Sequence, residues 1–239
     1  MALSAYRGAR VKRIEDPRLI NGRGTFVDDL TFAGLRHVAV VRSPHAHALI
    51  RHVSAPTSVV LITARDLGDP LWLPGEVKGA LARHPVLAVD QACYVGQPVA
   101  LVVADDPYKA ADAAEQVRVE WEPLRAILDP EDGLLPDAPR IHPDLSSNVA
   151  YRSHLRHGEP DEAFARAAVV VTQRIAHQRL AAVPLEARAV VAAPPSGRER
   201  RLTVWSSTQM PHALRDTLEE LPPIAGTRVR VIAPDVGGG

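Results

Sequence analysis

The feature that most constrains the fold is a β–α–β pattern in residues 98–121. Residues 99–104 (VALVVA) are a continuous apolar run, typical of a strand that is covered on both faces. Asp106 and Pro107 then supply an N-cap carboxylate and a proline at the first helical position. Residues 117–121 (VRVEW) alternate as a returning strand. An alanine-rich helix between them has an apolar stripe made of Ala110, Ala113, Ala114 and Val117. The pattern predicts a compact β–α–β unit.

Around this unit the first half is less regular. Residues 16–35 are dense in turn formers and predict an irregular arm. Residues 36–42 and 59–63 are apolar and β-branched, so we expect strands there. From Pro123 to Asn148 the chain holds five prolines and several aspartates, which favours an interdomain linker over a packed helix or a central strand.

The second half predicts further alternation of helices and strands. Two helices are expected, at residues 161–168 and 211–221, the second ended by a proline pair. Four strands are expected, at residues 169–175, 188–193, 202–206 and 228–232, with a hairpin-type loop at 194–201. The domain organisation is therefore an arm with an α/β domain at 1–128, a linker at 129–148 and a second domain at 149–239.

Composition excludes several classes of function. The 28 Lys and Arg balance the 28 Asp and Glu, so no global field would draw the chain to nucleic acid. No stretch approaches the roughly 18 apolar residues of a membrane span. Cys93 is the single cysteine, which excludes a disulfide framework and a cysteine-ligated iron–sulfur cluster within this chain. These features favour a cytoplasmic location.

Three segments carry candidate chemistry, each with a plainer alternative. The glycines Gly237, Gly238 and Gly239 follow an expected strand, where bare amides can approach a cofactor; a flexible tail is the alternative. Residues 206–212 (SSTQMPH) place polar groups, Gln209 among them, between a strand and a helix, although an ordinary capping turn also needs such residues. Glu186 lies among apolar residues, as a buried ion-pair partner or as a polar group near a cofactor.

Two other positions favour a structural interpretation. His45 and His47 are spaced for one face of an extended segment, but no third metal ligand accompanies them. Cys93 lies between Ala92 and Tyr94, with nothing adjacent in sequence to lower its pKa, so we expect a small buried apolar residue.

Taken in order, these segments resemble the large subunits of xanthine dehydrogenase, aldehyde oxidase and carbon monoxide dehydrogenase. The resemblance runs over nearly the whole chain, and its order and spacing carry more weight than any one motif. The matching segments are residues 15–24 (EDPRLINGRG), 28–30 (DDL), 41–48 (VRSPHAHA), 84–88 (HPVLA), 94–100 (YVGQPVA), 184–186 (PLE), 205–212 (WSSTQMPH) and 235–239 (DVGGG).

The resemblance implies an α+β fold: an α/β hammerhead domain followed by the incomplete start of a molybdenum-cofactor-binding domain. In that family the glutamine corresponding to Gln209 hydrogen-bonds an oxygen ligand of molybdenum, and the triple glycine leads into the same site. The implied cofactor is molybdenum–molybdopterin, in a cytosine dinucleotide form. The implied reactions are water-derived hydroxylation of a heterocycle or an aldehyde, or oxidation of carbon monoxide. The implied base, a glutamate, lies beyond Gly239, so no catalytic residue and no direct metal ligand is assigned here.

We therefore expect an N-terminal part of such a subunit, inactive by itself and without tightly bound cofactor. Two electrons leave molybdenum per turnover, and a chain with one cysteine cannot relay them through an iron–sulfur cluster. The expected partners are an iron–sulfur small subunit and an FAD-binding medium subunit, or a second chain carrying the rest of the large subunit. The alternative is a non-catalytic subunit-interaction module or an inactive truncated fragment.

Overall fold

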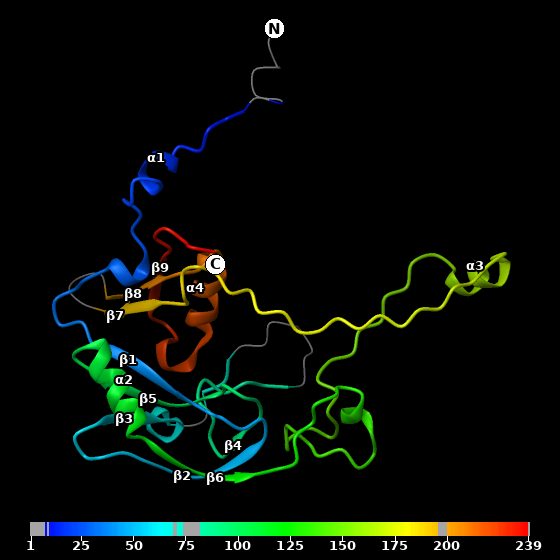
Figure 1. Ribbon diagram of the computed structural model, residues 1–239, viewed down its shortest axis with the longest axis horizontal. Coiled ribbons are helices and arrows are strands. Elements are labelled where there is room, and N and C mark those ends of the chain that lie inside the picture. The colour runs from blue at the N-terminus through cyan, green and yellow to red at the C-terminus, as the bar shows by residue number, and fades with distance from the viewer. Residues whose placement is uncertain (1–7, 9, 69–70, 74–81, 196–199, 239) are drawn as a thin grey trace. The chain divides into compact units, whose positions relative to one another are not determined.

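The computed structural model describes residue 8 and residues 10–68, 71–73, 82–195 and 200–238 (Figure 1). Two compact units make up the chain. The first, called here the hammerhead unit, comprises Ala33–Arg179 and Leu221–Pro223. The second, called here the glycine-loop unit, comprises Met1–Phe32, Leu180–Glu220 and Ile224–Gly239. The N-terminal arm thus groups by its contacts with the second half of the chain.

The first sheet of the hammerhead unit is antiparallel and has the order β1-β5-β3. Its strands are β1 (His37–Arg42), β3 (Val60–Thr63) and β5 (Pro98–Ala104). The expected strands at 36–42, 59–63 and 99–104 are therefore confirmed. The apolar run places β5 at the centre, with Val99 and Val102 fully buried, because a central strand has neighbours on both edges and is covered on its faces.

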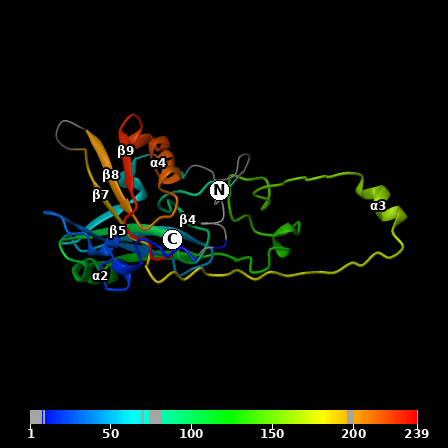
Figure 2. The same cartoon turned by 90° about the horizontal axis from the view of Figure 1, so that it is seen from above.

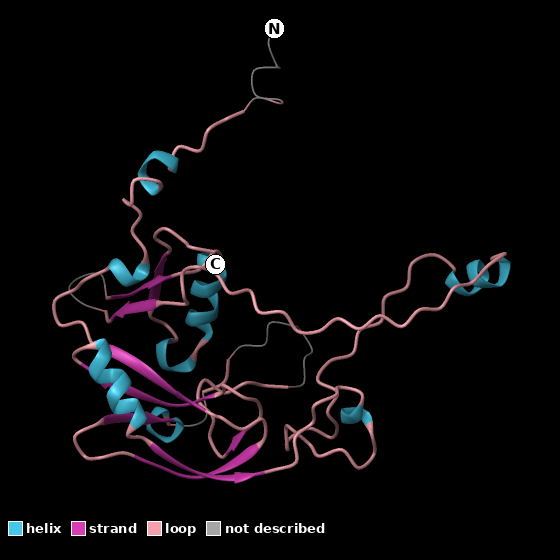
Figure 3. Cartoon of the chain, viewed as in Figure 1, coloured by secondary structure: helices cyan, strands magenta, loops and turns pink. Residues whose placement is uncertain are grey.

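The helix α2 (Pro107–Glu115) packs against β1 and β5 (Figure 3). Its first turn is built as the sequence predicts. Asp106 is the N-cap, and its carboxylate accepts hydrogen bonds from the backbone N–H groups of Tyr108 and Lys109 at 2.9 and 3.2 Å. Ala110 is buried at the centre of the apolar stripe, so a small side chain lets the helix lie close to the sheet.

The second sheet of this unit is also antiparallel and has the order β4-β2-β6. Its strands are β2 (Ala48–Ser54), β4 (Gln91–Ala92) and β6 (Arg118–Pro123). The core of the unit joins the two sheets. It contains Ile50, Ala88 and Val99, with Val53, Val119 and Trp121 packed against them.

This arrangement corrects the predicted β–α–β unit. Its strand, helix and strand exist at the expected positions, but β5 and β6 belong to different sheets and do not pair. The predicted compact unit in one sheet is wrong. The reason is that β6 pairs with β2, a strand that sequence periodicity does not reveal because a register irregularity between Ile50 and His52 breaks its alternation.

The glycine-loop unit contains a three-stranded sheet of order β7-β8-β9. Its strands are β7 (Val190–Ala193), β8 (Arg201–Ser206) and β9 (Arg228–Ile232). Between β8 and β9 runs α4 (Pro211–Glu220), which packs against β9 and is followed by the 3-10 turn η4 (Pro222–Ile224) (Figure 2). These elements confirm the strands expected at 188–193, 202–206 and 228–232 and the second helix. The hairpin between β7 and β8 is antiparallel, but most of its loop, residues 196–199, lies outside the described residues.

The N-terminal arm has only short elements, α1 (Asp16–Leu19) and the 3-10 turn η1 (Val27–Asp29). Other short turns are η2 (Ala64–Leu67) and η3 (Asp132–Leu134). The helix expected at 161–168 is present as α3 (Pro160–Arg166). The strand expected at 169–175 is wrong: this stretch is loop, and its valines are more than half exposed (Figure 3). β-branched residues form a strand only where a neighbouring strand supplies hydrogen bonds.

The stretch expected to be a linker is tied to the hammerhead unit by specific hydrogen bonds. The Asn148 amide donates to the carbonyls of Gly133 and Pro139 at 3.1 and 2.9 Å, and its oxygen accepts from the Ile141 N–H at 3.0 Å. The Gln91 amide donates to the Ile141 carbonyl at 2.8 Å. The stretch therefore has a defined conformation. The boundaries at 128 and 148 stay a prediction.

The α+β fold class is confirmed by both units, which combine small sheets with few helices. None of the described helices is long and apolar enough to cross a membrane.

Candidate functional site

The parallel pair β8 and β9 defines the candidate site. The pairing runs from Arg201 opposite Arg228 to Trp205 opposite Ile232, so both strands end at the same edge of the sheet. Gln209 follows the end of β8, and the glycine segment, residues 236–238, follows the end of β9. In open α/β sheets ligands bind beyond the carboxyl ends of the strands. Three of the four predicted cofactor residues therefore follow one sheet edge, whereas Gly239 lies outside the described residues.

The glycine segment packs closely on the Pro184–Glu186 stretch. A Cβ atom added to Gly237 would lie 2.5 Å from the Cβ of Glu186, and one added to Gly238 would lie 2.6 Å from the Cβ of Pro184. Gly238 also has a φ of 136°, which L side chains rarely adopt. Close packing within the chain therefore requires glycine at both positions, independently of any ligand.

Glu186 bonds both polar groups of the Gly237 backbone. Its carboxylate Oε2 accepts the Gly237 N–H at 2.7 Å, and its own N–H donates to the Gly237 carbonyl at 3.2 Å. The other carboxylate oxygen accepts the N–H of the buried Val27 at 3.4 Å. Glu186 is thus a hydrogen-bonded carboxylate that touches the glycine segment, and among the described residues none of its hydrogen-bond partners is a cation. The geometry favours the polar role over the ion pair.

Asp235 joins the same region to the N-terminal arm. Its carboxylate receives a bidentate pair from the Arg18 guanidinium and a hydrogen bond of 2.7 Å from the Thr25 N–H. Its own N–H donates to the Thr25 carbonyl at 3.0 Å. The bonds from Arg18 and Thr25 lower the pKa of Asp235 to about 2. Sequence reasoning missed this contact because Arg18 and Asp235 are 217 residues apart and no local pattern links them.

The polar turn after β8 divides into structural residues and a free one. The Ser207 hydroxyl and backbone pair with Ala189, its Oγ accepting the Ala189 N–H at 2.9 Å. The Thr208 hydroxyl accepts the Met210 N–H at 3.1 Å, as in a turn that precedes a helix. Gln209 is exposed, and its side chain makes no hydrogen bond within the described part of the chain. The capping-turn interpretation is therefore confirmed for Ser207 and Thr208, whereas the role of Gln209 at a ligand stays a prediction.

The free donors at this edge suit an oxygen-rich ligand. Within the described residues the Gly238 N–H has no hydrogen-bond partner, and neither does the Gln209 amide. Amide N–H groups of this kind bind anionic or carbonyl oxygens, such as those of a pterin or a phosphate. The described residues contain no group of three or more His, Cys, Asp or Glu side chains placed to hold a metal ion directly. The donor set therefore fits contact with an organic cofactor rather than direct ligation of a metal.

His47 is a buried structural residue. Its Nδ1 lies 2.7 Å from the Arg125 carbonyl, which can only accept, so Nδ1 carries the proton. Its Nε2 then accepts from the Gln91 amide at 2.9 Å. His45 instead packs edge-on against Trp121, with ring centroids 5.3 Å apart. The two imidazoles thus serve the hammerhead core separately.

Cys93 also serves the hammerhead unit. Its thiol lies 3.3 Å from the Ile141 carbonyl, to which it can donate. Burial raises the pKa of the Cys93 thiol, although a hydrogen bond from Gln91 acts in the opposite direction. A raised pKa disfavours the reactive thiolate, in agreement with a structural role, but Cys93 is only partly buried, not fully buried as expected.

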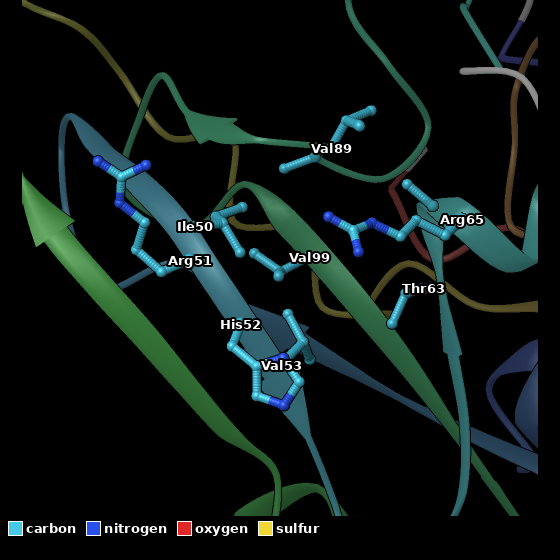
Figure 4. A pocket seen from close by; sticks show the side chains of 10 residues that line it. Ile50, Arg51, His52, Val53, Thr63, Arg65, Val89 and Val99 are labelled. Carbon is cyan, nitrogen blue, oxygen red and sulfur yellow. The ribbon is translucent and has the colours of Figure 1, made fainter.

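The hammerhead unit has a small pocket lined by residues of β2, β3 and β5, among others (Figure 4). Its volume is about 110 Å³, well below the roughly 300–1,000 Å³ of ligand sites. Ile50 of β2 and Val99 of β5 lie close together at its centre, as Figure 4 shows. This pocket is a packing gap beside the core rather than a second site.

Comparison with known families divides the chain into two matched regions. Residues 21–125 match the a/b hammerhead domain of aldehyde oxidase and xanthine dehydrogenase. Residues 141–239 match the molybdopterin cofactor-binding domain. The second match contains Gln209 and the glycine segment, and the first contains both antiparallel sheets.

Individual relatives match nearly the whole chain. The carbon monoxide dehydrogenase large chain of Hydrogenophaga pseudoflava is 37% identical over 263 residues, which cover 100% of this chain and 32% of the relative. The nicotine 6-hydroxylase large subunit of Paenarthrobacter nicotinovorans is also 37% identical, covering 97% of this chain and 29% of the relative. The crystal structure of quinoline 2-oxidoreductase from Pseudomonas putida 86 matches with a TM-score of 0.83 and 34% identity, over 96% of this chain and 30% of that one.

The chain thus spans about a third of the length of these relatives. The two family matches follow one another along the chain, and they include the motifs of the resemblance from residue 21 onward. The chain therefore belongs to the xanthine dehydrogenase, aldehyde oxidase and carbon monoxide dehydrogenase family, and corresponds to the N-terminal part of its molybdopterin-binding large subunit.

Proposed function

We propose that the complete protein is the large subunit of a molybdenum-cofactor-dependent hydroxylase or dehydrogenase, and that this chain supplies one part of its cofactor site. The observation that carries the proposal is the shared edge of β8 and β9, which Gln209 and the glycine segment follow. This edge lies in the region that matches the molybdopterin cofactor-binding domain. Relatives of this chain act on carbon monoxide, nicotine or quinoline, as their names state, so the substrate stays open.

The residues of this chain would bind and orient rather than react. Gln209 would donate its amide N–H to an oxygen of the bound cofactor, because its side chain is exposed and unpaired. Gly237 and Gly238 would bring bare backbone close to it, with the Gly238 N–H as donor, and Gly239 would continue that surface. The cofactor when bound supplies the two-electron redox chemistry. The base that assists the reaction lies outside residues 1–239 in this proposal.

Further features of the complete protein follow as proposals. The cofactor would carry a cytosine dinucleotide. Electrons would leave through a separate iron–sulfur subunit and an FAD-binding subunit, since Cys93 alone cannot hold a cluster. The same single cysteine favours a cytoplasmic location.

A specific observation also favours the rival function, a non-catalytic module for subunit interaction. Apolar side chains along residues 169–185 are exposed, among them Val171 at 82% and Leu185 at 102%, and exposed apolar surface marks contact with other chains. The coding sequence just downstream distinguishes the two functions. A frame that resumes with Phe-Gly-Gly and a long cofactor region supports the enzyme, whereas unrelated sequence supports the module.

Metal analysis tests the proposal directly. We expect residues 1–239, expressed alone in a host that makes the cofactor, to contain no stoichiometric molybdenum by mass spectrometry. The complete subunit with its partners should contain molybdenum and release the pterin on denaturation. Tight molybdenum binding by residues 1–239 would contradict the view that the site is shared with further chain. A complete subunit that contains neither molybdenum nor pterin would refute the proposed molybdenum-cofactor-dependent function.

A further inference from the structure

The contacts of Glu186 connect two motifs that the sequence shows only separately, Pro184–Glu186 and the glycine segment. Glu186 and Gly237 are 51 positions apart. The carboxylate takes the Gly237 N–H, and the Glu186 N–H is donated to the Gly237 carbonyl. One residue therefore satisfies both polar groups of the Gly237 peptide. Gly96 is also bonded on both groups, but by two residues, Ser43 and Arg42.

Packing fixes the same relation sterically. Glu186 and Pro184 occupy the space next to the Cβ positions of Gly237 and Gly238, so any side chain at these two positions would clash. The hydrogen bonds at Gly237 hold the backbone in one conformation, while the Gly238 N–H has no partner in the described chain. Because the backbone is already ordered, less conformational entropy is lost when the Gly238 N–H donates to a ligand.

The N-terminal arm also contacts Glu186. The second oxygen of the Glu186 carboxylate accepts the Val27 N–H. Asp235, two residues before Gly237, holds Thr25 and Arg18 of the same arm. Glu186 is thus placed between the arm and the glycine segment, which are far apart in sequence.

We propose that Glu186 is a positioning residue, which holds Gly237 through its carboxylate and its backbone so that the Gly238 amide is presented at the cofactor edge. The ligand is an oxygen-bearing organic cofactor, and this part rests on the proposed function. The positioning itself is a property of this chain and is measurable without any cofactor.

Backbone amide exchange of the 239-residue chain, followed by NMR, tests the positioning. Glu186→Ala should speed exchange at Gly237 by about tenfold to a hundredfold, as expected when a hydrogen bond to a charged acceptor is removed. Glu219→Ala is the matched control, because the Glu219 carboxylate accepts the Val229 N–H at 3.1 Å in the same unit. It should speed exchange at Val229 and leave Gly237 unchanged.

Conservative variants separate positioning from general stability. Glu186→Gln keeps one acceptor oxygen and should restore most of the protection at Gly237. Glu186→Asp keeps the charge but shortens the side chain, so Gly237 should lose protection. The proposal is overturned if Gly237 exchanges within about twofold of wild type in Glu186→Ala and Glu186→Asp, or if Val229 and Gly237 lose protection together in both alanine variants. If Glu186→Ala does not fold, Glu186→Gln and Glu186→Asp decide between the same outcomes.

Failure of the cofactor proposal leaves a different result. If the complete subunit holds no pterin, the exchange pattern at Gly237 stands and only the identity of the ligand is lost. If the exchange pattern fails while the complete subunit retains molybdenum, the cofactor site stands and Glu186 has no positioning role.

Discussion

Two strand–helix–strand stretches in this chain look alike in sequence but differ in three dimensions. In the hammerhead unit, β5 and β6 flank α2 yet belong to separate antiparallel sheets. In the glycine-loop unit, β8 and β9 flank α4 and pair in parallel as neighbours. The first stretch contributes Val99 and Trp121 to a core that joins two sheets.

The difference explains why only one of the two stretches carries a candidate site. Parallel neighbours bring two carboxyl ends to one edge, where the segments that follow them have room for a ligand. Antiparallel partners put the two strand ends on opposite edges. Gln209 and the glycine segment therefore follow a shared edge, whereas the polar groups of the hammerhead unit, such as His47 and Gln91, bond one another inside it.

The largest expected effect is on the hammerhead core. Val99→Ala removes buried methyl groups between the two sheets and should lower the free energy of unfolding by about 2 kcal/mol. Val38→Ala on the adjacent strand β1 is the control, since Val38 is 54% exposed, and it should cost well under about 1 kcal/mol. Urea denaturation measures both. Equal losses in the two variants would mean that β5 is not the centre of a core.

The starts of the two helices give a smaller effect. Asp106→Ala removes a side chain that accepts two backbone N–H groups of α2 and should cost about 1 kcal/mol. Thr208→Ala removes a single turn bond ahead of α4 and should cost about half as much. Thermal unfolding of both variants compares the two stretches directly. A larger loss for Thr208→Ala would mean that the turn ahead of α4 stabilises the fold more than the Asp106 cap of α2 does.

The stability of the glycine-loop unit should depend on pH through Asp235. The pKa of Asp235 is lowered from 3.8 to about 2 by Arg18 and Thr25. Because the folded pKa is depressed, the stabilisation is complete above the ordinary value and is lost as the pH falls toward 2. The difference in melting temperature between wild type and Asp235→Asn should therefore stay constant from pH 7 to about 5 and shrink below about 4. A difference that shrinks between pH 7 and 6 would contradict this.

The smallest effect on stability is expected at the candidate site itself. Gln209→Ala should change the free energy of unfolding by less than about 0.5 kcal/mol, because the side chain is exposed and unpaired. In the complete subunit it should still lower molybdenum retention, measured by mass spectrometry. If molybdenum retention is unchanged, Gln209 does not belong to the cofactor site, and the β8–α4–β9 stretch would then have only a structural role, like the β5–α2–β6 stretch.

Local sequence signals predicted most elements whose causes are local. The cap at Asp106, the buried run of β5 and the stop of α4 before Pro222 follow from side chains within a few residues. β2 escaped prediction because its register irregularity hides its alternation. Residues 169–175 misled because valines favour a strand only where a partner strand exists, and the described chain supplies none there.

The candidate site was predictable in part. Order along the chain and family resemblance predicted Gln209 and the glycines as cofactor-binding residues. The structure shows that they follow two parallel strands, and their contact with a cofactor stays a prediction. The roles of Glu186 and Asp235 were not predictable, since each depends on partners 51 to 217 residues away. Contacts between residues so far apart in the chain leave no local pattern in a single sequence.

The sequence by itself determined that this chain has an apolar strand run, a capped alanine-rich helix, one cysteine and a glycine-rich end in the order typical of one family. These properties depend on neighbouring residues and on counts. Only the tertiary structure decided that β5 and β6 separate into two sheets while β8 and β9 pair, and that Glu186 holds Gly237. The physical reason is that strand pairing and backbone hydrogen bonds are satisfied between segments, so the choice of partner depends on the whole fold.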